Sequence, residues 1–281
     1  MRFQVLGPVR VVREDRSLEL ARLKERLVLG LMLTHAGRIV SQDRLVDAVW
    51  SRKPPANPAA TLHVHICHLR SVLEPGRPAR APAQILLRRQ DGYLLAVTPG
   101  QIDAHVFETA IRQGFRAMAA SRPAAAAGIL AGALALWRGD PYDGLSGHEF
   151  ALAEIIRLEE LRLLALESLA EADLALGRHA SALPGLVQLV ALHPLRERLR
   201  VLEMTALYRA GRQSDALLSY QNGRALLAGE LGVDPGPELR RCHAQVLAHD
   251  PLLDDPATLS TRPAGRALSG LPGLPADLSR V

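Results

Sequence analysis

The sequence of 281 residues predicts an α+β domain at the amino terminus followed by an all-α domain. Short β-rich runs flank three helical segments within residues 1–97, and helical patterns rich in alanine and leucine fill residues 98–250. Part of the second region repeats at an interval of 34 residues, the separation of Gly177 and Gly211. Only 4% of the residues are aromatic, so leucine and alanine must fill the cores, which favours helices.

Positive charge is concentrated in the first domain. Residues 1–97 hold 16 lysines and arginines against 8 acidic residues, whereas the rest of the chain holds 18 against 21. This uneven distribution is typical of a nucleic-acid-binding domain joined to a regulatory or protein-binding domain.

The composition excludes several other classes of protein. Cys67 and Cys242 are too few for a disulfide framework and match no zinc spacing. Gly7-Pro8 and Arg10 interrupt the first residues before a signal-peptide core, and the longest apolar run, Leu27 to Leu33, is too short to span a bilayer. We therefore expect a cytoplasmic protein that does not interact with membranes.

The first domain opens with a predicted sheet and two helices. Three β-rich runs predict a small antiparallel sheet, namely residues 3–6, 9–12 and 18–20. Strong helix formers with a wide apolar face predict a helix over residues 22–35, which ends at Ala36-Gly37. Ser41 caps a second predicted helix over residues 42–50.

A third helix is predicted from Asn57 to Gly76, with prolines before it and Pro75-Gly76 as its stop. At about 100° per residue, an apolar stripe lies on one side: Leu62, Ile66, Leu69 and Leu73. The other side carries groups that can form hydrogen bonds or touch a methyl group: Thr61, His63, Val64, Cys67, His68, Arg70 and Ser71. No acidic residue interrupts this face, so we interpret the helix as one that reads DNA.

Residues 84–89 and 93–97 predict two strands joined at Gln90-Asp91-Gly92. A sheet, two helices, a third helix with a polar outward face and a β-hairpin follow one another in the order of a winged helix-turn-helix. Arg88 and Arg89 at the tip of this wing are placed to reach a neighbouring minor groove or phosphates.

The second domain is predicted to consist of tetratricopeptide-like helical hairpins. The segment Ala172–Arg178 is similar to Ala206–Arg212, and small alanines recur at the same offset after each. A weaker third copy is expected at residues 121–137. Residues 251–281 are rich in proline, glycine and alanine with little periodicity, so we expect a mostly disordered tail.

The chain resembles the Streptomyces antibiotic regulatory proteins in a series of ordered motifs: FQVLGPVRV, RLVLGLMLTHAGRIVSQDRLVDAVW, DGYLL, LALWRG, EADLALGRHA, HPLRERLR, ALYRAGRQSDAL and ELGVDPGPELR. The similarity covers residues 3–249. The family implies an OmpR/PhoB-type winged helix over residues 1–97 and a helical, tetratricopeptide-like bacterial transcriptional activator domain over residues 98–250. Its members are transcriptional activators.

The resemblance also implies roles for individual residues. Contacts with bases or adjacent phosphates are implied for five residues: Thr61, His63, Val64, Cys67 and His68. Arg70 falls on a phosphate-contacting position, and Arg89 falls where the wing inserts an arginine. Family members usually have arginine in place of His68. Because histidine is largely neutral at pH 7, this departure predicts a lower or mildly pH-dependent affinity.

Three further cations are candidates for contact with phosphate or RNA polymerase. Arg44 lies in the second predicted helix, and we assign it to DNA. Arg52 and Lys53 lie in the loop before the third helix, and we assign them to RNA polymerase, although exposed loop charges without a fixed partner are at least as common.

The sequence therefore predicts a sequence-specific DNA-binding transcriptional activator of a secondary-metabolite gene cluster. By resemblance, two copies bind double-stranded promoter DNA as a homodimer on direct repeats near the −35 region and contact the sigma subunit of RNA polymerase holoenzyme. A protein-interaction adaptor with a degenerate winged helix is the alternative. The possibility that a small effector binds in the concave side of the repeats stays open.

No motif of an enzyme is present. Gly-x-Ser-x-Gly, His-Glu-x-x-His and Gly-x-Gly-x-x-Gly after a strand are all missing, so we expect neither catalysis nor a cofactor. His63 and Cys67, four residues apart, suit a shared metal ion. No second pair supplies the remaining ligands, so no metal site is expected.

Overall fold

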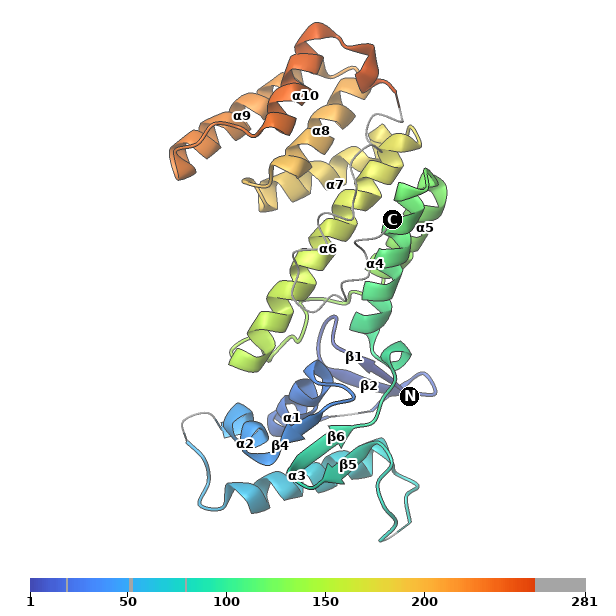
Figure 1. Cartoon of the computed structure of the whole chain (residues 1–281), viewed down its shortest axis with the longest axis vertical. Helices are drawn as coiled ribbons and strands as arrows, with labels where there is room; N and C mark the ends of the chain where they lie inside the picture. Colours follow the sequence, from blue (N-terminus) through green and yellow to red (C-terminus); the bar gives the residue numbers. More distant parts are fainter. Residues whose placement is uncertain (19, 51–52, 79, 256–281) are drawn as a thin grey trace. The chain divides into compact units, whose positions relative to one another are not determined.

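The computed structural model describes residues 1–18, 20–50, 53–78 and 80–255 (Figure 1). Contacts between Cα atoms divide the chain into two compact units. The amino-terminal unit comprises Met1–Thr109 and Ala133–Arg162, and the helical unit comprises Ala110–Gly132 and the described residues from Leu163 onward. Within these ranges, no helix is both long and apolar enough to cross a membrane.

The chain begins with an antiparallel sheet of three short strands, β1 (Arg2–Gln4), β2 (Arg10–Arg13) and β3 (Arg16–Leu18). Glu14 and Asp15 form the turn between β2 and β3, and both have positive φ angles, of 50° and 61°, as a type I′ hairpin turn requires. The predicted first strand extended to residue 6. It ends earlier because the N–H groups of Val5 and Leu6 donate to the carboxylate of Asp103, at 2.8 and 3.2 Å, instead of to a strand.

Three helices and a second sheet complete the winged helix. The elements are α1 (Leu23–Thr34), β4 (Ile39–Ser41), α2 (Gln42–Trp50), α3 (Pro58–Leu73), β5 (Leu86–Arg89) and β6 (Gly92–Leu95). α2 has the predicted bounds, whereas α3 begins one residue later and ends three residues earlier than the helix predicted from Asn57 to Gly76. β4 was not predicted, and it makes the wing part of a three-stranded sheet with the order β4-β6-β5.

Gly92 is required at the start of β6. A Cβ atom at this position would lie 2.0 Å from the carbonyl oxygen of Val40, which belongs to the neighbouring strand β4. The core beneath the sheet is formed by buried aliphatic residues of the three helices, among them Leu27, Leu45, Leu62 and Ile66. The fold is therefore an α+β winged helix, as predicted.

The amino-terminal unit extends beyond residue 97, where the sequence predicted a domain boundary. After the short η1 (Pro99–Gln101), α4 (Asp103–Ala119) places Asp103 against the chain that follows β1. The N–H groups of Arg138 and Tyr142 donate to the carbonyl oxygens of Leu6 and Val5, both at 2.8 Å. These long-range bonds hold residues 138–142 in the same unit as the winged helix.

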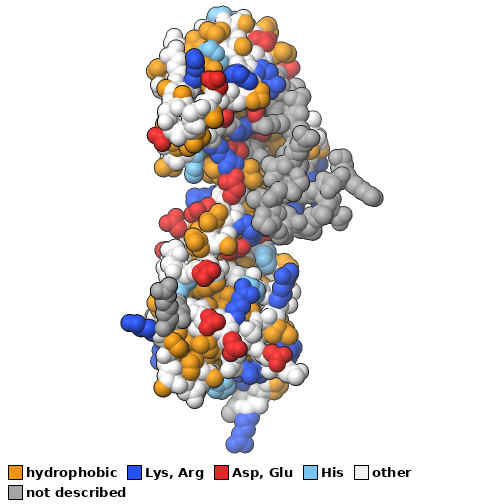
Figure 2. Space-filling view, turned by 60° about the vertical axis from the view of Figure 1, so that its left-hand side comes forward, with side chains coloured by type: hydrophobic (Ala, Val, Ile, Leu, Met, Phe, Trp, Pro, Cys, Tyr) orange, Lys and Arg blue, Asp and Glu red, His pale blue; other side chains and the backbone are white. Residues whose placement is uncertain are grey.

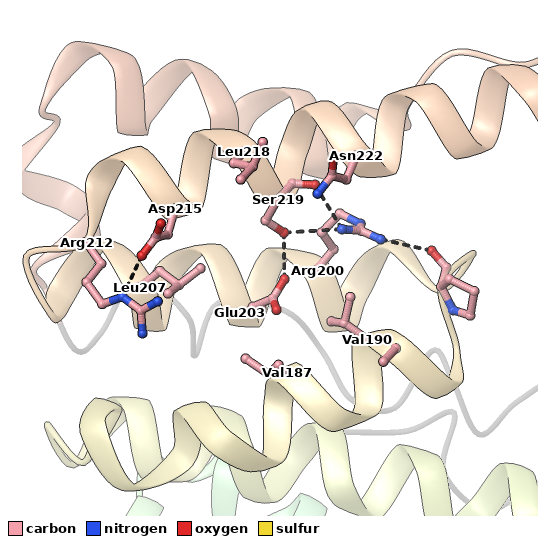
Figure 3. A pocket seen from close by; sticks show the side chains of 12 residues that line it. Val187, Val190, Arg200, Glu203, Leu207, Arg212, Asp215, Leu218, Ser219 and Asn222 are labelled. Carbon is pink, nitrogen blue, oxygen red and sulfur yellow. Dashed lines mark hydrogen bonds and ion pairs between the residues drawn. The ribbon is translucent and has the colours of Figure 1, made fainter.

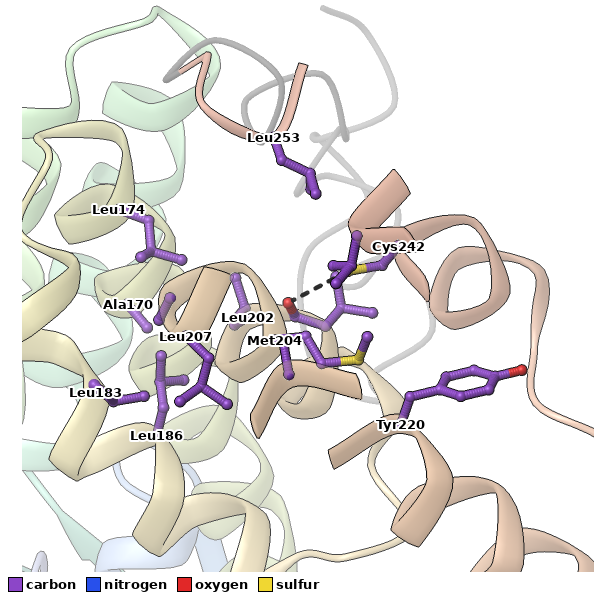
Figure 4. Packing of buried hydrophobic residues seen from close by; sticks show 14 of the residues in the cluster. Ala170, Leu174, Leu183, Leu186, Leu202, Met204, Leu207, Tyr220, Cys242 and Leu253 are labelled. Carbon is purple, nitrogen blue, oxygen red and sulfur yellow. Dashed lines mark hydrogen bonds between the residues drawn. The ribbon is translucent and has the colours of Figure 1, made fainter. Parts of the chain in front are cut away.

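Helices follow one another through the rest of the described chain. After α4 come α5 (Pro123–Leu134), α6 (Glu149–Ala175), α7 (His179–Leu192), α8 (Glu197–Arg209), α9 (Gln213–Leu231), α10 (Pro237–Ala248) and the short η2 (Pro251–Leu253). Figure 4 shows side chains from α6 to α10 and η2 meeting in one apolar cluster around α8. The predicted all-α second domain is confirmed.

The predicted repeat coincides with repeated turn geometry. Gly177 and Gly211 both have a φ of +73°, the left-handed conformation that favours glycine after a helix. In each turn the residue after the glycine makes the same backbone hydrogen bond. The N–H of Arg178 donates to the carbonyl oxygen of Asp173 at 2.8 Å, and the N–H of Arg212 donates to the carbonyl oxygen of Leu207 at 2.9 Å. The turn between α6 and α7 and the turn between α8 and α9 therefore have the same geometry, as the 34-residue repeat predicts.

The turn between α4 and α5, at the start of the expected third copy at residues 121–137, has the same geometry. Ser121 occupies the left-handed position, with a φ of 52°, and the N–H of Arg122 donates to the carbonyl oxygen of Ala117 at 2.9 Å. Serine in place of glycine explains why the sequence signal was weak there.

The expected disordered tail does not begin at residue 251. Leu253 is buried in the helical unit, and Arg209 donates to the carbonyl oxygens of Leu253 and Asp255, at 2.6 and 3.0 Å. These contacts attach residues 251–255 to α8. The rest of the expected tail, residues 256–281, lies outside the described residues.

Candidate nucleic-acid interface

The candidate interface is built on α3, whose start is fixed by its cap. Asn57 Oδ1 accepts a hydrogen bond from the N–H of Ala60 at 3.0 Å, and Pro58 occupies the first helical position, where no N–H is needed. The four aliphatic residues predicted to face inward are all buried: Leu62, Ile66, Leu69 and Leu73. This stripe fixes the rotation of α3 and therefore which side chains face solvent.

The outward face of α3 is accessible to solvent. His63, Val64, Cys67, His68 and Ser71 are exposed, whereas Thr61 and Arg70 are half-buried. The hydroxyls of Thr61 and Ser71 donate to backbone carbonyls one turn earlier, at 2.9 and 3.1 Å. Exposed imidazoles suit hydrogen bonds with base edges, and an exposed valine suits contact with a thymine methyl group.

His63 and Cys67 lie beside each other on this face, with 3.5 Å between His63 Nε2 and Cys67 Sγ. In the described part of the chain, no group of three or more histidine, cysteine or acidic side chains is arranged to hold a metal ion. Cys242, the other cysteine, is buried in the helical unit, and burial raises the pKa of its thiol to about 11.

One edge of α3 is fixed to the wing. Glu74, directly after the helix, accepts hydrogen bonds from the N–H groups of Gln84 and Ile85, at 2.6 and 2.9 Å. Arg70 Nε donates to the carbonyl oxygen of Leu86 at 2.9 Å. The wing is thereby held beside the reading face, as Figure 1 shows for α3, β5 and β6.

The two wing arginines differ in their surroundings. The guanidinium carbon of Arg88 lies 4.7 Å from the ring centroid of Tyr93, and Arg88 Nη1 donates to Gln42 Oε1 at 3.0 Å. Both arginines are exposed, and Arg89 Nη1 donates to the carbonyl oxygen of Arg88 at 3.3 Å. Arg88 therefore packs against Tyr93 and Gln42, whereas the bond of Arg89 lies within its own strand.

The other edge of α3 lies against α1, and there the structure reveals a residue that sequence reasoning missed. Arg22, directly before α1, places Nη1 2.5 Å from Nδ1 of His68. Oε1 of Glu25 lies 3.3 Å from the same Nδ1. No local pattern signals this cluster, because 46 positions separate Arg22 from His68.

His65 completes the packing of α3. It is half-buried and lies near Trp50, with 6.0 Å between the ring centroids. Burial lowers the pKa of His65 and outweighs the opposing effect of the Glu25 carboxylate. His65 is therefore a packing residue, and its burial suppresses its positive charge.

Of the three remaining candidate residues, the structure describes two. Arg44 is exposed on α2, and Lys53 is exposed in the loop after it, with its N–H donating to Trp50 at 3.0 Å. Arg52 lies outside the described residues. Figure 2 shows that acidic side chains lie among the lysines and arginines on the visible face of the amino-terminal unit, so that face is not uniformly basic.

The helical unit contains a cavity of about 420 Å³ between α7, α8 and α9. Figure 3 shows Arg200, Ser219 and Glu203 linked within it. Arg200 Nη1 donates to the carbonyl oxygen of Ser219 at 2.9 Å, and Ser219 Oγ donates to Glu203 at 2.6 Å. Burial lowers the pKa of Arg200. These polar groups form hydrogen bonds with one another, so we interpret the network as a structural connection between α8 and α9.

Comparison with known proteins matches two consecutive regions of the chain to known domain families. Residues 15–95 match the family "Transcriptional regulatory protein, C terminal", and residues 102–247 match "Bacterial transcriptional activator domain". The first range contains α1 to β6, and the second contains α4 to most of α10. The winged helix and the helical hairpins are thus each matched as a domain.

Individual relatives agree with this match. The transcriptional regulator RedD of Streptomyces coelicolor is 40% identical, over 96% of this chain and 77% of its own length. The regulatory protein AfsR of the same species is 37% identical over 99% of this chain, but the chain spans only 28% of that protein. A solved structure of EmbR from Mycobacterium tuberculosis, in complex with a low-affinity phosphopeptide, matches with a TM-score of 0.87 and 33% identity, covering 95% of this chain and 69% of that one.

These families and relatives are transcriptional regulators. Their two-domain order is the order found in the structure, a winged helix followed by helical repeats. The chain therefore belongs to the Streptomyces antibiotic regulatory proteins, transcriptional regulators that join an OmpR-type winged helix to a bacterial transcriptional activator domain.

Proposed function

We propose that this protein activates transcription by binding specific promoter DNA through α3 and the wing. The observation that carries the proposal is the solvent-facing side of α3, which holds exposed His63, Val64 and Cys67 and no acidic residue. In this arrangement α3 enters the major groove and its exposed side chains read base edges. Arg89 projects toward the neighbouring minor groove or its phosphates.

Residues at the edges of α3 and on α2 have a different role in the proposal. Arg44, Arg70 and Arg88 contribute positive charge toward phosphates, which increases affinity without selecting sequence. Thr61 and His68 lie at the rim of the reading face, where they contact bases or adjacent phosphates.

The transcription machinery and the assembly on DNA belong to the same proposal. Two copies bind side by side as a homodimer on direct repeats near the −35 region, and the helical unit holds the pair together. Lys53, in the loop before α3, and its neighbour in sequence Arg52 contact the sigma subunit of RNA polymerase. The target is a secondary-metabolite gene cluster, and the site of action is the cytoplasm, where the chromosome lies. These statements are supported by the family to which the chain belongs.

The proposal is tested by titrating the full chain against a labelled promoter fragment taken from beside its own gene. Binding measured by fluorescence anisotropy at several salt concentrations is expected to weaken steeply, with log K falling by about 0.9 per phosphate contact for each unit of log salt. A scrambled fragment of equal length serves as the control for specificity. Binding that is absent, or insensitive to salt, would contradict the proposal and favour the adaptor, in which the helical repeats act without DNA.

A further inference from the structure

We infer that Arg22, held in place by His68, is a second phosphate-binding site of the interface, on the edge of α3 that faces α1. This inference rests on the proposed binding of DNA. It adds a contact residue that lies outside α3 and the wing, and it assigns a positioning role to His68.

The geometry keeps the Arg22 side chain both anchored and accessible. Its Nη1 lies 2.5 Å from His68 Nδ1 and 3.6 Å from Glu25 Oε1. The side chain of Glu25 is only 6% exposed, whereas that of Arg22 is 56% exposed and that of His68 is 45% exposed. The carboxylate therefore anchors the cluster from inside, and the guanidinium faces solvent.

The chemistry of the pair determines where the positive charge lies. A guanidinium has five N–H donors and cannot accept a hydrogen bond, so in the close contact with Arg22 the Nδ1 of His68 must be the acceptor. The positive charge at this edge of α3 is therefore that of Arg22, which keeps further N–H donors for a phosphate oxygen.

The position of the pair matches the shape of DNA. On α3, His68 and Arg70 are two residues apart and lie at opposite edges of the exposed face, about 160° apart around the helix. A helix in the major groove has a phosphate backbone on each side of it. Arg70 and the wing arginines provide cations on one side, and Arg22 provides the cation on the other.

Neighbouring groups on α1 do not supply this charge. Lys24 Nζ donates to the carbonyl oxygen of Val49 at 3.1 Å and lies 4.8 Å from the ring centroid of Trp50. Without Arg22, the Glu25 carboxylate at this edge would lose the guanidinium beside it. Such an edge would repel a phosphate, so Arg22 is needed for the two edges to be equally suited to DNA.

The test compares Arg22→Ala with wild type in the same salt titration, on the promoter fragment and on the scrambled fragment. A lost phosphate contact is expected to weaken binding to both fragments by a similar factor and to reduce the salt slope by about 1. Arg10→Ala, which removes an exposed cation from β2, is the matched control and should leave the slope unchanged.

Two further variants separate phosphate binding from a purely structural role of Arg22. Arg22→Lys keeps the charge, so it should retain most of the salt slope. His68→Arg supplies a charge directly at this edge, so Arg22→Ala should cost less than about twofold in that background. Thermal melting identifies any variant that fails to fold. If Arg22→Ala fails to fold, the salt slope of Arg22→Lys decides whether the charge at this position binds phosphate.

The outcomes distinguish the inference from the proposed function. If wild type shows no salt-dependent DNA binding, both are overturned. If wild type binds and Arg22→Ala behaves like Arg10→Ala in affinity and slope, only the inference is overturned. A loss of affinity in Arg22→Ala with an unchanged slope would also overturn it, because that result describes a structural role.

Discussion

Arg70 Nε donates a hydrogen bond to the carbonyl oxygen of Leu86 at 2.9 Å, and this bond joins the reading helix to the first strand of the wing. The guanidinium carbon of Arg70 also lies 5.9 Å from the ring centroid of Tyr93, which is buried. Family resemblance assigns Arg70 to a phosphate. The structure shows a half-buried arginine that also fixes the wing relative to α3.

Replacing Arg70 with alanine should therefore affect both folding and DNA binding. Loss of the bond to Leu86 is expected to lower the free energy of unfolding by about 1 kcal/mol. DNA affinity should fall by more than one phosphate contact accounts for, because the wing is no longer held beside α3. Urea denaturation and anisotropy titration measure the two effects. An unchanged unfolding midpoint with weaker binding would mean that Arg70 acts only on DNA.

The two wing arginines should respond differently to alanine substitution. Arg89→Ala is expected to reduce the salt slope of DNA binding by about 1 and to change stability by less than about 0.5 kcal/mol. Arg88→Ala removes the contact with the Tyr93 ring and the bond to Gln42, so it should cost about 0.5–1 kcal/mol of unfolding free energy. Equal stability of the two variants would show that the Tyr93 contact contributes nothing in solution.

The contrast between these residues shows what the sequence can predict. The period of Leu62, Ile66 and Leu69 determines the buried side of α3, so the exposed face follows directly. The partners of Arg70 and Arg88 do not follow, because they depend on β5 and β6 folding back onto α2 and α3. Arg22 is missed for the same reason: its contact with His68 joins two segments distant in sequence.

The secondary structure shows the same division between local and long-range information. A serine cap predicted the start of α2, and proline, asparagine and glycine signals predicted a helix that contains α3. β4 has only three residues and little periodicity, and it exists because β6 pairs with it. Ser121 marks a repeated turn that a search for glycine finds only weakly. For β4, a tertiary contact therefore decides what the local residues leave open.

Histidine protonation should make stability depend on pH. Burial lowers the pKa of three histidines below the ordinary value of 6.5: His35, His65 and His243. Between the lowered values and 6.5, the unfolded chain binds more protons than the folded one, so the free energy of unfolding should fall as the pH falls through this window. Urea denaturation at pH values from about 7.5 to about 5.5 measures this decrease in the free energy of unfolding.

His65 provides a specific check of this dependence. His65→Gln removes one of the three groups, so its stability should decrease less steeply with falling pH than that of wild type, whatever its level at neutral pH. Val64→Gln, at an exposed position of the same helix, removes no titratable group, so it is the control and should keep the wild-type pH dependence. If the two variants show the same slope as wild type, burial of His65 does not govern its protonation.

Two glycines of α9 should respond to alanine in opposite directions. A Cβ atom at Gly223 would lie 2.4 Å from Cδ and Nε of Arg200, whereas a Cβ atom at Gly229 would meet nothing within 4 Å. Gly229→Ala should stabilise the helix by about 0.5–1 kcal/mol, because alanine has the higher helix propensity. Gly223→Ala should instead cost about 1–3 kcal/mol, because it displaces the buried guanidinium from Ser219 and Pro194.

Chemical denaturation of both variants measures this difference, and a third variant identifies its cause. If Gly223 exists to accommodate Arg200, the cost of Gly223→Ala should shrink in an Arg200→Ala background, since the side chain that it displaces is already absent. An equal cost in both backgrounds would place the strain elsewhere in α9. Such a result would also remove the reason to regard the link from Arg200 to Ser219 as the connection between α8 and α9.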